Sequence, residues 1–117
     1  LPLTDKTKYV FNKEIFNSMK NDSYFINLGR GQTVNENHLI DALREKIIMG
    51  AALDVFDTEP LSDESPLWDI DNVLLTPHIA NVSKNYWRDQ IELFTKNVNR
   101  FINGNSLVNI VDLKRGY

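Results

Sequence analysis

The stretch Ser23–Phe56, SYFINLGRGQTVNENHLIDALREKIIMGAALDVF, contains two short apolar runs separated by one amphipathic segment. The runs over residues 23–28 and 51–56 are rich in aromatic, branched or small apolar side chains, which predicts two buried strands. Residues 35–45 between them repeat apolar side chains at helical spacing, and Asn35 can cap this helix. Two apolar strands joined by a helix are typical of a parallel sheet in an α/β fold.

The same alternation continues on both sides of this stretch. We predict a helix over residues 12–19, a third strand over residues 73–76 that Pro77 stops, and a long helix over residues 83–103 that Ser83 caps. Large apolar residues recur at helical spacing along the long helix, so we expect its aromatic residues to be core: Trp87, Phe94 and Phe101. Three strands leave one sheet edge uncovered, so we expect this chain to be a piece of a longer protein.

Composition narrows the class of protein. The chain has 117 residues, 42% of them hydrophobic and 25% charged, as in a globular protein with one modest core. Its 13 basic residues are scattered among 16 acidic ones, so nucleic acid is not a predicted partner. The absence of cysteine excludes thiolate nucleophiles and thiolate metal sites, and no metal site is predicted. No apolar run approaches the roughly 18 residues of a membrane span, so we predict a cytoplasmic protein.

Polar side chains follow each predicted strand. Arg30 stands between two glycines after the first strand, Asp54 closes the second with Glu59 five residues on, and His78 follows the third. Because parallel strands end at one edge of their sheet, these groups can share a cleft. An arginine binds a carboxylate through two hydrogen bonds, and a histidine oriented by an acid can protonate a carbonyl oxygen. This set suits the reduction of a keto acid by a hydride from a cofactor.

Each of these residues also has a structural interpretation. Arg30 can be a surface arginine in a tight turn, and Asp54 can hydrogen-bond loop amides at the strand end. Glu59 can be a solvated charge in an acidic loop, and His78 a structural histidine. The segment 29–34 begins like a dinucleotide-binding G-x-G-x-x-G motif but has valine in place of the third glycine, so it is not a phosphate-binding turn.

Five segments occur in a characteristic order over nearly the whole chain: LPLTDKT, MKNDSYFINLGRGQTVNENHLIDAL, GAALDVFDTEPL, SPLW and NVLLTPHIA. They resemble the D-isomer-specific 2-hydroxyacid dehydrogenase family. The segment DVFDTEPLSDESPLW and the closing Gly116–Tyr117 are most similar to its glyoxylate/hydroxypyruvate reductase branch.

The resemblance implies roles for individual residues. Arg30 would bind the substrate carboxylate and keto oxygen, and His78 would be the general acid and base, paired with Glu59. The cofactor would be NAD or NADP, and the glycines beside Arg30 would leave room for its nicotinamide. The residues implied to lie along the cofactor are Leu1, Pro2, Leu28, Gly29, Arg30, Asp54, His78, Ala80 and Asn81.

The resemblance also implies an organisation. The chain would be the C-terminal half of a Rossmann-like doubly wound parallel sheet, with residues 1–82 in the NAD(P)-binding domain. Residues 83–104 would form a connecting helix, and residues 105–117 a tail that packs on the substrate domain. Members of the family usually form homodimers. We expect the isolated fragment to be inactive because it lacks the G-x-G-x-x-G segment, and the alternative is a non-enzymatic binding or assembly module.

Overall fold

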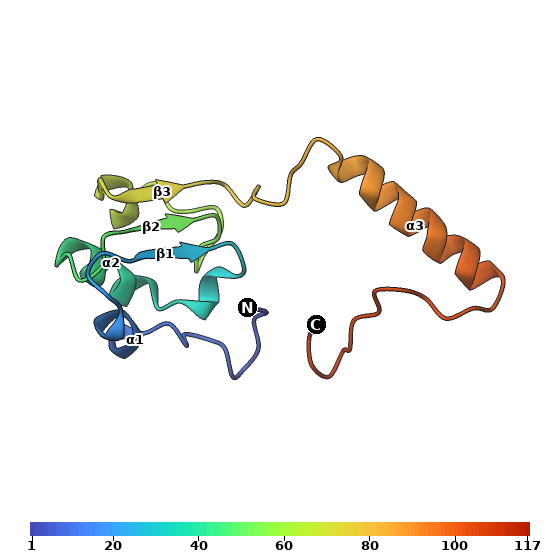
Figure 1. Cartoon of the computed structure of the whole chain (residues 1–117), viewed down its shortest axis with the longest axis horizontal. Helices are drawn as coiled ribbons and strands as arrows, with labels where there is room; N and C mark the ends of the chain where they lie inside the picture. The colour runs from blue at the N-terminus through green and yellow to red at the C-terminus, as the bar shows by residue number, and fades with distance from the viewer. The chain divides into compact units, whose positions relative to one another are not determined.

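The computed structural model describes all residues from Leu1 to Tyr117. It divides the chain into two compact units, Leu1–Ala80 and Asn81–Tyr117, and Figure 1 shows the order of their elements along the chain. The first unit contains all three strands, and the second contains one long helix and a tail. The functional division predicted at residue 82 stays a prediction.

A parallel three-stranded sheet forms the centre of the first unit. Its strands are β1 (Tyr24–Asn27), β2 (Gly50–Leu53) and β3 (Val73–Leu75), in the spatial order β1-β2-β3. All three strands run in the same direction, so their carboxyl ends lie at one edge of the sheet. The predicted α/β fold with a parallel sheet is confirmed.

Two helices precede and follow β1. Helix α1 (Lys13–Ser18) is capped by Asn12, whose side chain accepts hydrogen bonds from two backbone N–H groups of the first turn. Helix α2 (Glu36–Arg44) is capped by Asn35, whose Oδ1 accepts from His38 N–H, and it joins β1 to β2. Both helices and both caps agree with the sequence prediction. Two short 3-10 helices, η1 (Gly31–Thr33) and η2 (Pro66–Asp69), lie in the loops after β1 and before β3.

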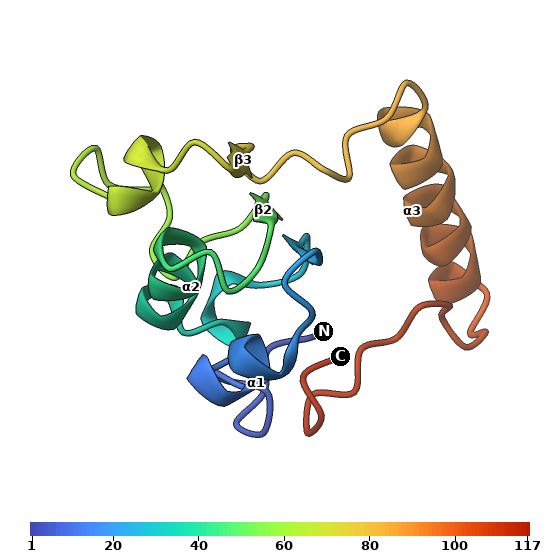
Figure 2. The same ribbon diagram turned by 60° about the vertical axis from the view of Figure 1, so that its left-hand side comes forward.

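The core lies between these helices and one face of the sheet. Figure 2 views the strands nearly end-on and shows α1 and α2 on the same side of them. Buried residues from the helices and the sheet form one cluster there, including Phe16, Phe25, Leu39, Leu43, Ala51 and Leu53. On the opposite sheet face the large apolar side chains are exposed: Tyr24, Ile26, Leu28 and Leu74.

Helix α3 (Tyr86–Ile102) differs from its prediction in two respects. It begins after Asn85 without a side-chain cap, so the predicted Ser83 cap is wrong. Its aromatic residues Trp87, Phe94 and Phe101 are 74%, 71% and 76% exposed, so their predicted place in a core is wrong for this chain. Helical periodicity predicts an apolar face but does not supply the element that covers it, and the second unit has no further helix or strand. No helix combines the length and the apolar composition needed to cross a membrane.

Candidate active site

The loop after β1 holds Arg30 through buried polar residues. Asn27, the last residue of β1, is buried; its Oδ1 accepts from Gly29 N–H at 3.1 Å, and its Nδ2 donates to the Arg30 carbonyl at 3.2 Å. The buried Thr33 hydroxyl donates to the same carbonyl at 2.7 Å. These contacts fix the Arg30 backbone while its side chain stays exposed. The sequence prediction missed Asn27 and Thr33, although a polar residue that ends an apolar strand was a usable signal.

Gly31 brings this loop against the segment after β2. A Cβ atom at Gly31 would lie 1.8 Å from the carbonyl oxygen of Phe56, so no side chain fits there. The expectation that both glycines leave room for a nicotinamide is therefore wrong for Gly31, whose bare Cα faces protein backbone. At Gly29, a Cβ would lie 3.0 Å from the carbonyl oxygen of Leu1, so these two predicted cofactor residues are neighbours.

Glu59 and His78 form a pair at this edge. Nδ1 of His78 lies 2.8 Å from Oε2 of Glu59, and Oε1 of Glu59 accepts from Phe56 N–H at 3.0 Å. The hydrogen bond to His78, that from Phe56 and the nearby Arg30 charge together lower the pKa of Glu59. A carboxylate has no proton to donate, so Nδ1 carries the hydrogen and Nε2 is the nitrogen left for chemistry. The three predicted catalytic residues thus lie in one neighbourhood.

Asp54 is turned into the protein. It is 2% exposed, and it follows the last residue of β2, which makes the predicted strand over residues 51–56 too long. Its Oδ1 accepts from the Thr76 hydroxyl at 2.6 Å and from Ile79 N–H at 2.9 Å, and its Oδ2 accepts from Ala80 N–H at 2.8 Å. Burial alone would raise the pKa of Asp54, but these three hydrogen bonds lower it below its usual value. The structural interpretation of Asp54 is confirmed, and its contact with a cofactor stays a prediction.

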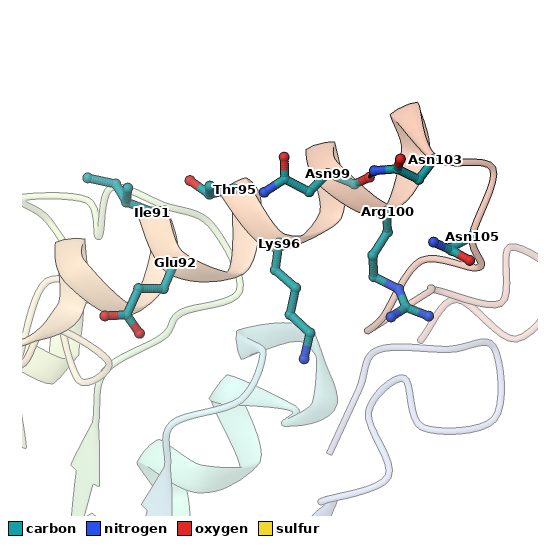
Figure 3. A pocket seen from close by; sticks show the side chains of 8 residues that line it. All are labelled: Ile91, Glu92, Thr95, Lys96, Asn99, Arg100, Asn103 and Asn105. Atoms are coloured by element: carbon teal, nitrogen blue, oxygen red, sulfur yellow. Dashed lines mark hydrogen bonds between the residues drawn. The ribbon is translucent and has the colours of Figure 1, made fainter.

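An apolar hollow of about 600 Å³ adjoins the Glu59–His78 pair. Leu61, Trp68 and Leu75 contribute to its wall. Apolar walls with a few convergent polar groups are typical of small-molecule sites. A second hollow runs along the exposed side of α3 and the loop after it, where Lys96 and Arg100 project from the helix (Figure 3). It contains none of the predicted site residues.

The remaining predicted cofactor residues occupy less defined positions. Leu1, Pro2, Leu28 and Ala80 are exposed residues of the first unit, while Asn81 begins the second unit. Leu28 follows β1 directly, and the backbone of Ala80 is held by Asp54. The structure therefore groups Leu1, Leu28 and Ala80 with the carboxyl edge of the sheet.

Comparisons with known proteins give a consistent result. Residues 1–80 match the family model of the D-isomer specific 2-hydroxyacid dehydrogenase NAD binding domain. All 117 residues align with 37% of glyoxylate/hydroxypyruvate reductase A of Citrobacter koseri, at 38% identity. The whole chain superposes on 48% of a D-isomer specific 2-hydroxyacid dehydrogenase of Xanthobacter autotrophicus, solved with NADPH and MES, with a TM-score of 0.90 and 43% identity.

A further solved structure is similar over the whole chain. It is an NADPH-dependent glyoxylate/hydroxypyruvate reductase of Sinorhizobium meliloti, in complex with NADP and sulfate, with a TM-score of 0.91 and 37% identity. The chain covers 38% of that protein. It therefore spans less than half the length of each of these relatives.

Proposed function

Because the chain belongs to the D-isomer-specific 2-hydroxyacid dehydrogenase family, we propose that it forms the acid–base and carboxylate-binding part of an NAD(P)-dependent reductase of small 2-oxo acids. The observation that carries this proposal is the Glu59–His78 pair, with Arg30 close enough to lower the pKa of Glu59. The similarity of the chain to the glyoxylate/hydroxypyruvate reductases of Citrobacter koseri and Sinorhizobium meliloti supports a glyoxylate- or hydroxypyruvate-like substrate.

His78 is the proton donor of the proposed reduction. With Nδ1–H donated to Glu59, Nε2 of the imidazolium gives its proton to the carbonyl oxygen of the substrate. Glu59 keeps the ring in one orientation, and Phe56 N–H in turn fixes Glu59. In the reverse direction Nε2 accepts the proton from the hydroxyl group of a D-2-hydroxy acid.

Arg30 binds the anionic end of the substrate. One of its Nη1–H groups donates to the Gly29 carbonyl at 2.8 Å, which leaves other guanidinium N–H groups for the substrate. The fork geometry matches a carboxylate in two parallel hydrogen bonds, which a lysine does not reproduce. Arg30 and His78 then hold the two ends of one small 2-oxo acid.

The carboxyl edge of the sheet fits the nicotinamide end of NAD or NADP. Exposed Leu28 offers an apolar side chain at this edge, and the Gly29 carbonyl next to it accepts from Arg30. The cofactor, when bound, supplies the hydride. Residues 29–34 lack the third glycine of a G-x-G-x-x-G motif, so they do not form a dinucleotide-binding turn. We propose that the isolated chain binds cofactor weakly and has no turnover, which a nicotinamide fluorescence titration would test; tight binding would contradict it.

A chimera tests the proposed activity. This chain replaces the segment that it matches in the Xanthobacter autotrophicus dehydrogenase, and the consumption of NADPH with glyoxylate or hydroxypyruvate is followed. We expect turnover that His78→Ala lowers by roughly 100- to 10,000-fold, the usual contribution of a general acid. His38→Ala is the matched control. His38 lies in α2 and its Nδ1 accepts from Lys13 N–H of α1, outside the proposed site, so this variant should leave turnover unchanged. A folded chimera whose turnover is indifferent to His78 would contradict the proposal, and one without turnover would favour a non-enzymatic module.

The assembly and location implied by the family complete the proposal. We propose a cytoplasmic homodimer in which residues 105–117 pack on a substrate domain. Light scattering of the active chimera would detect the dimer, and a monomer would contradict it.

A further inference from the structure

The Asp54 carboxylate binds residues on both sides of His78. Thr76, two residues before the histidine, donates its hydroxyl to Oδ1, and Ile79, the residue after it, donates its N–H to the same oxygen. Ala80 N–H occupies Oδ2. Asp54 itself is anchored at the sheet, because its N–H donates to the Asn27 carbonyl at 3.0 Å. One buried side chain therefore fixes the loop on either side of the histidine.

His78 needs this support because of its backbone. Its φ is +54°, in the left-handed region that residues with a Cβ atom disfavour. Its N–H donates to the Thr76 carbonyl at 3.1 Å, which makes a tight turn between Thr76 and the histidine. A strained residue persists only where the surrounding contacts fix it, and such residues concentrate at functional sites. The three hydrogen bonds to Asp54 supply those contacts here.

We propose that Asp54 and Thr76 are positioning residues that hold the His78 ring against Glu59 and toward the substrate. Neither touches the reacting atoms in this scheme. Both act through the backbone of residues 76–80, and their loss lets the ring leave the geometry in which Nε2 points at the substrate carbonyl. The inference rests on the proposed catalytic role of His78.

Thr76 gives the sharpest variants. Thr76→Val removes the hydroxyl and keeps the branched shape, whereas Thr76→Ser keeps the hydroxyl and its hydrogen bond to Asp54. Asp54→Asn keeps one acceptor oxygen but turns an NH2 group toward a backbone N–H donor. Because Asp54→Asn removes a buried charge and can prevent folding, the Thr76 pair carries the test. Thr95, an exposed residue of α3, gives the matched control Thr95→Val.

The first measurement uses the 117-residue chain and needs no activity. Nitrogen-15 NMR of the His78 ring should show Nδ1 hydrogen-bonded in the unchanged chain, in Thr76→Ser and in Thr95→Val. In Thr76→Val we expect that signature to weaken and the amide protons of Ile79 and Ala80 to shift. Identical ring and amide signals in Thr76→Val and the unchanged chain would overturn the inference.

The second measurement uses the active chimera. We expect Thr76→Val to lower kcat roughly ten- to a hundredfold, the range for a catalytic group displaced by about 1 Å, with KM for the 2-oxo acid changed less than twofold. Thr76→Ser should restore kcat. If His78→Ala abolishes turnover while Thr76→Val does not reduce it, the positioning inference fails and the proposed function stands. If His78→Ala leaves turnover intact, the proposed function fails and the catalytic part of this inference fails with it.

Discussion

The imidazole of His78 donates to one oxygen of Glu59 at 2.8 Å, and the other oxygen of the same carboxylate accepts from Phe56 N–H at 3.0 Å. Glu59 is therefore held at both oxygens, although it is partly exposed. A side chain held in this way can orient its partner ring, which a freely solvated carboxylate does not do.

Replacing Glu59 by glutamine should lower kcat/KM for reduction in the active chimera. The hydrogen bond to His78 is the largest cause of the lowered pKa of Glu59, so the contact is made to the carboxylate form. Glu59→Gln replaces one carboxylate oxygen by an NH2 group, so either the His78 ring or Phe56 N–H loses its acceptor. The measurement is kcat/KM, with the exposed Glu64→Gln as control. An unchanged kcat/KM would show that Glu59 does not orient the histidine.

Asp54 should contribute to stability at neutral pH and lose that contribution in acid. Its pKa is lowered in the folded state, so its hydrogen bonds stabilise the fold above the unfolded value of about 4 and stop doing so as the pH falls through the folded value. We expect the Tm of the chain to drop from about pH 4 downward. The drop should be smaller in Asp54→Asn, which starts from a lower Tm at pH 7. Asp71→Asn, at an exposed position, should keep the full acid dependence.

Glu36 should affect the pH dependence of stability in the opposite direction to Asp54. Burial raises its pKa, and the neighbouring Asp57 charge adds to this, while the hydrogen bond from Asp57 N–H at 3.3 Å lowers it. A raised folded pKa means that the fold loses stability as the pH rises from about 4.5 through that value. Glu36→Gln keeps an oxygen for Asp57 N–H and removes the half-buried charge. We therefore expect the variant to have a higher urea midpoint at pH 7 than the unchanged chain. A lower midpoint at pH 7 would show that the charge itself stabilises this loop.

Gly31→Ala should destabilise the fold by more than about 2 kcal/mol, since overpacking against immobile backbone exceeds ordinary core strain. The added Cβ would lie 1.8 Å from Phe56 O and 1.9 Å from Phe56 C, so two backbone segments would have to separate. Gly104→Ala is the contrast: its φ is +68° but the space around it is open, so only the conformational cost of about 1 to 2 kcal/mol applies. Chemical unfolding measures both. Equal losses would mean that the contact between Gly31 and Phe56 relaxes readily.

Asn27 should govern substrate binding through Arg30. Asn27→Asp keeps the acceptor for Gly29 N–H but sets a carboxylate oxygen against the Arg30 carbonyl in place of the Nδ2 donor. We expect KM for the 2-oxo acid to rise roughly tenfold in the active chimera, the effect of losing one hydrogen bond of about 1.4 kcal/mol, with kcat changed less. Asn21→Asp, in the exposed turn before β1, is the control. A change in kcat alone would assign Asn27 to the chemical step instead.

Local signals in the sequence predicted most of the first unit. Asn12 and Asn35 cap helices as predicted, because an N-cap needs only the side chain and the next few backbone N–H groups. The predicted second strand extended beyond Leu53, where β2 ends. The Asp54 side chain hydrogen-bonds residues 76–80, and the strand propensity of residues 51–56 gives no information about such distant partners. The exposed aromatic face of α3 is the other failure, since periodicity carries no information about a covering element.

The proximity of the three charged groups was predictable from the sequence, but the residues that support them were not. Arg30 and His78 come just after β1 and β3, Glu59 lies in the loop after β2, and parallel topology brings these positions together. The left-handed backbone of His78 and the hydrogen bond from Thr76 to Asp54 depend on how the segments after β2 and β3 meet in space. No residue pattern within one of these segments records that meeting.

The backbone contact at Gly31 limits how this scaffold can be re-engineered. Gly31 lies directly against the backbone of Phe56. An insertion between Phe56 and Glu59 that moves Phe56 would therefore also displace the turn that carries Arg30. Libraries aimed at bulkier substrates should therefore leave both turns at their native length and diversify Leu61 and Trp68 on the adjoining apolar wall.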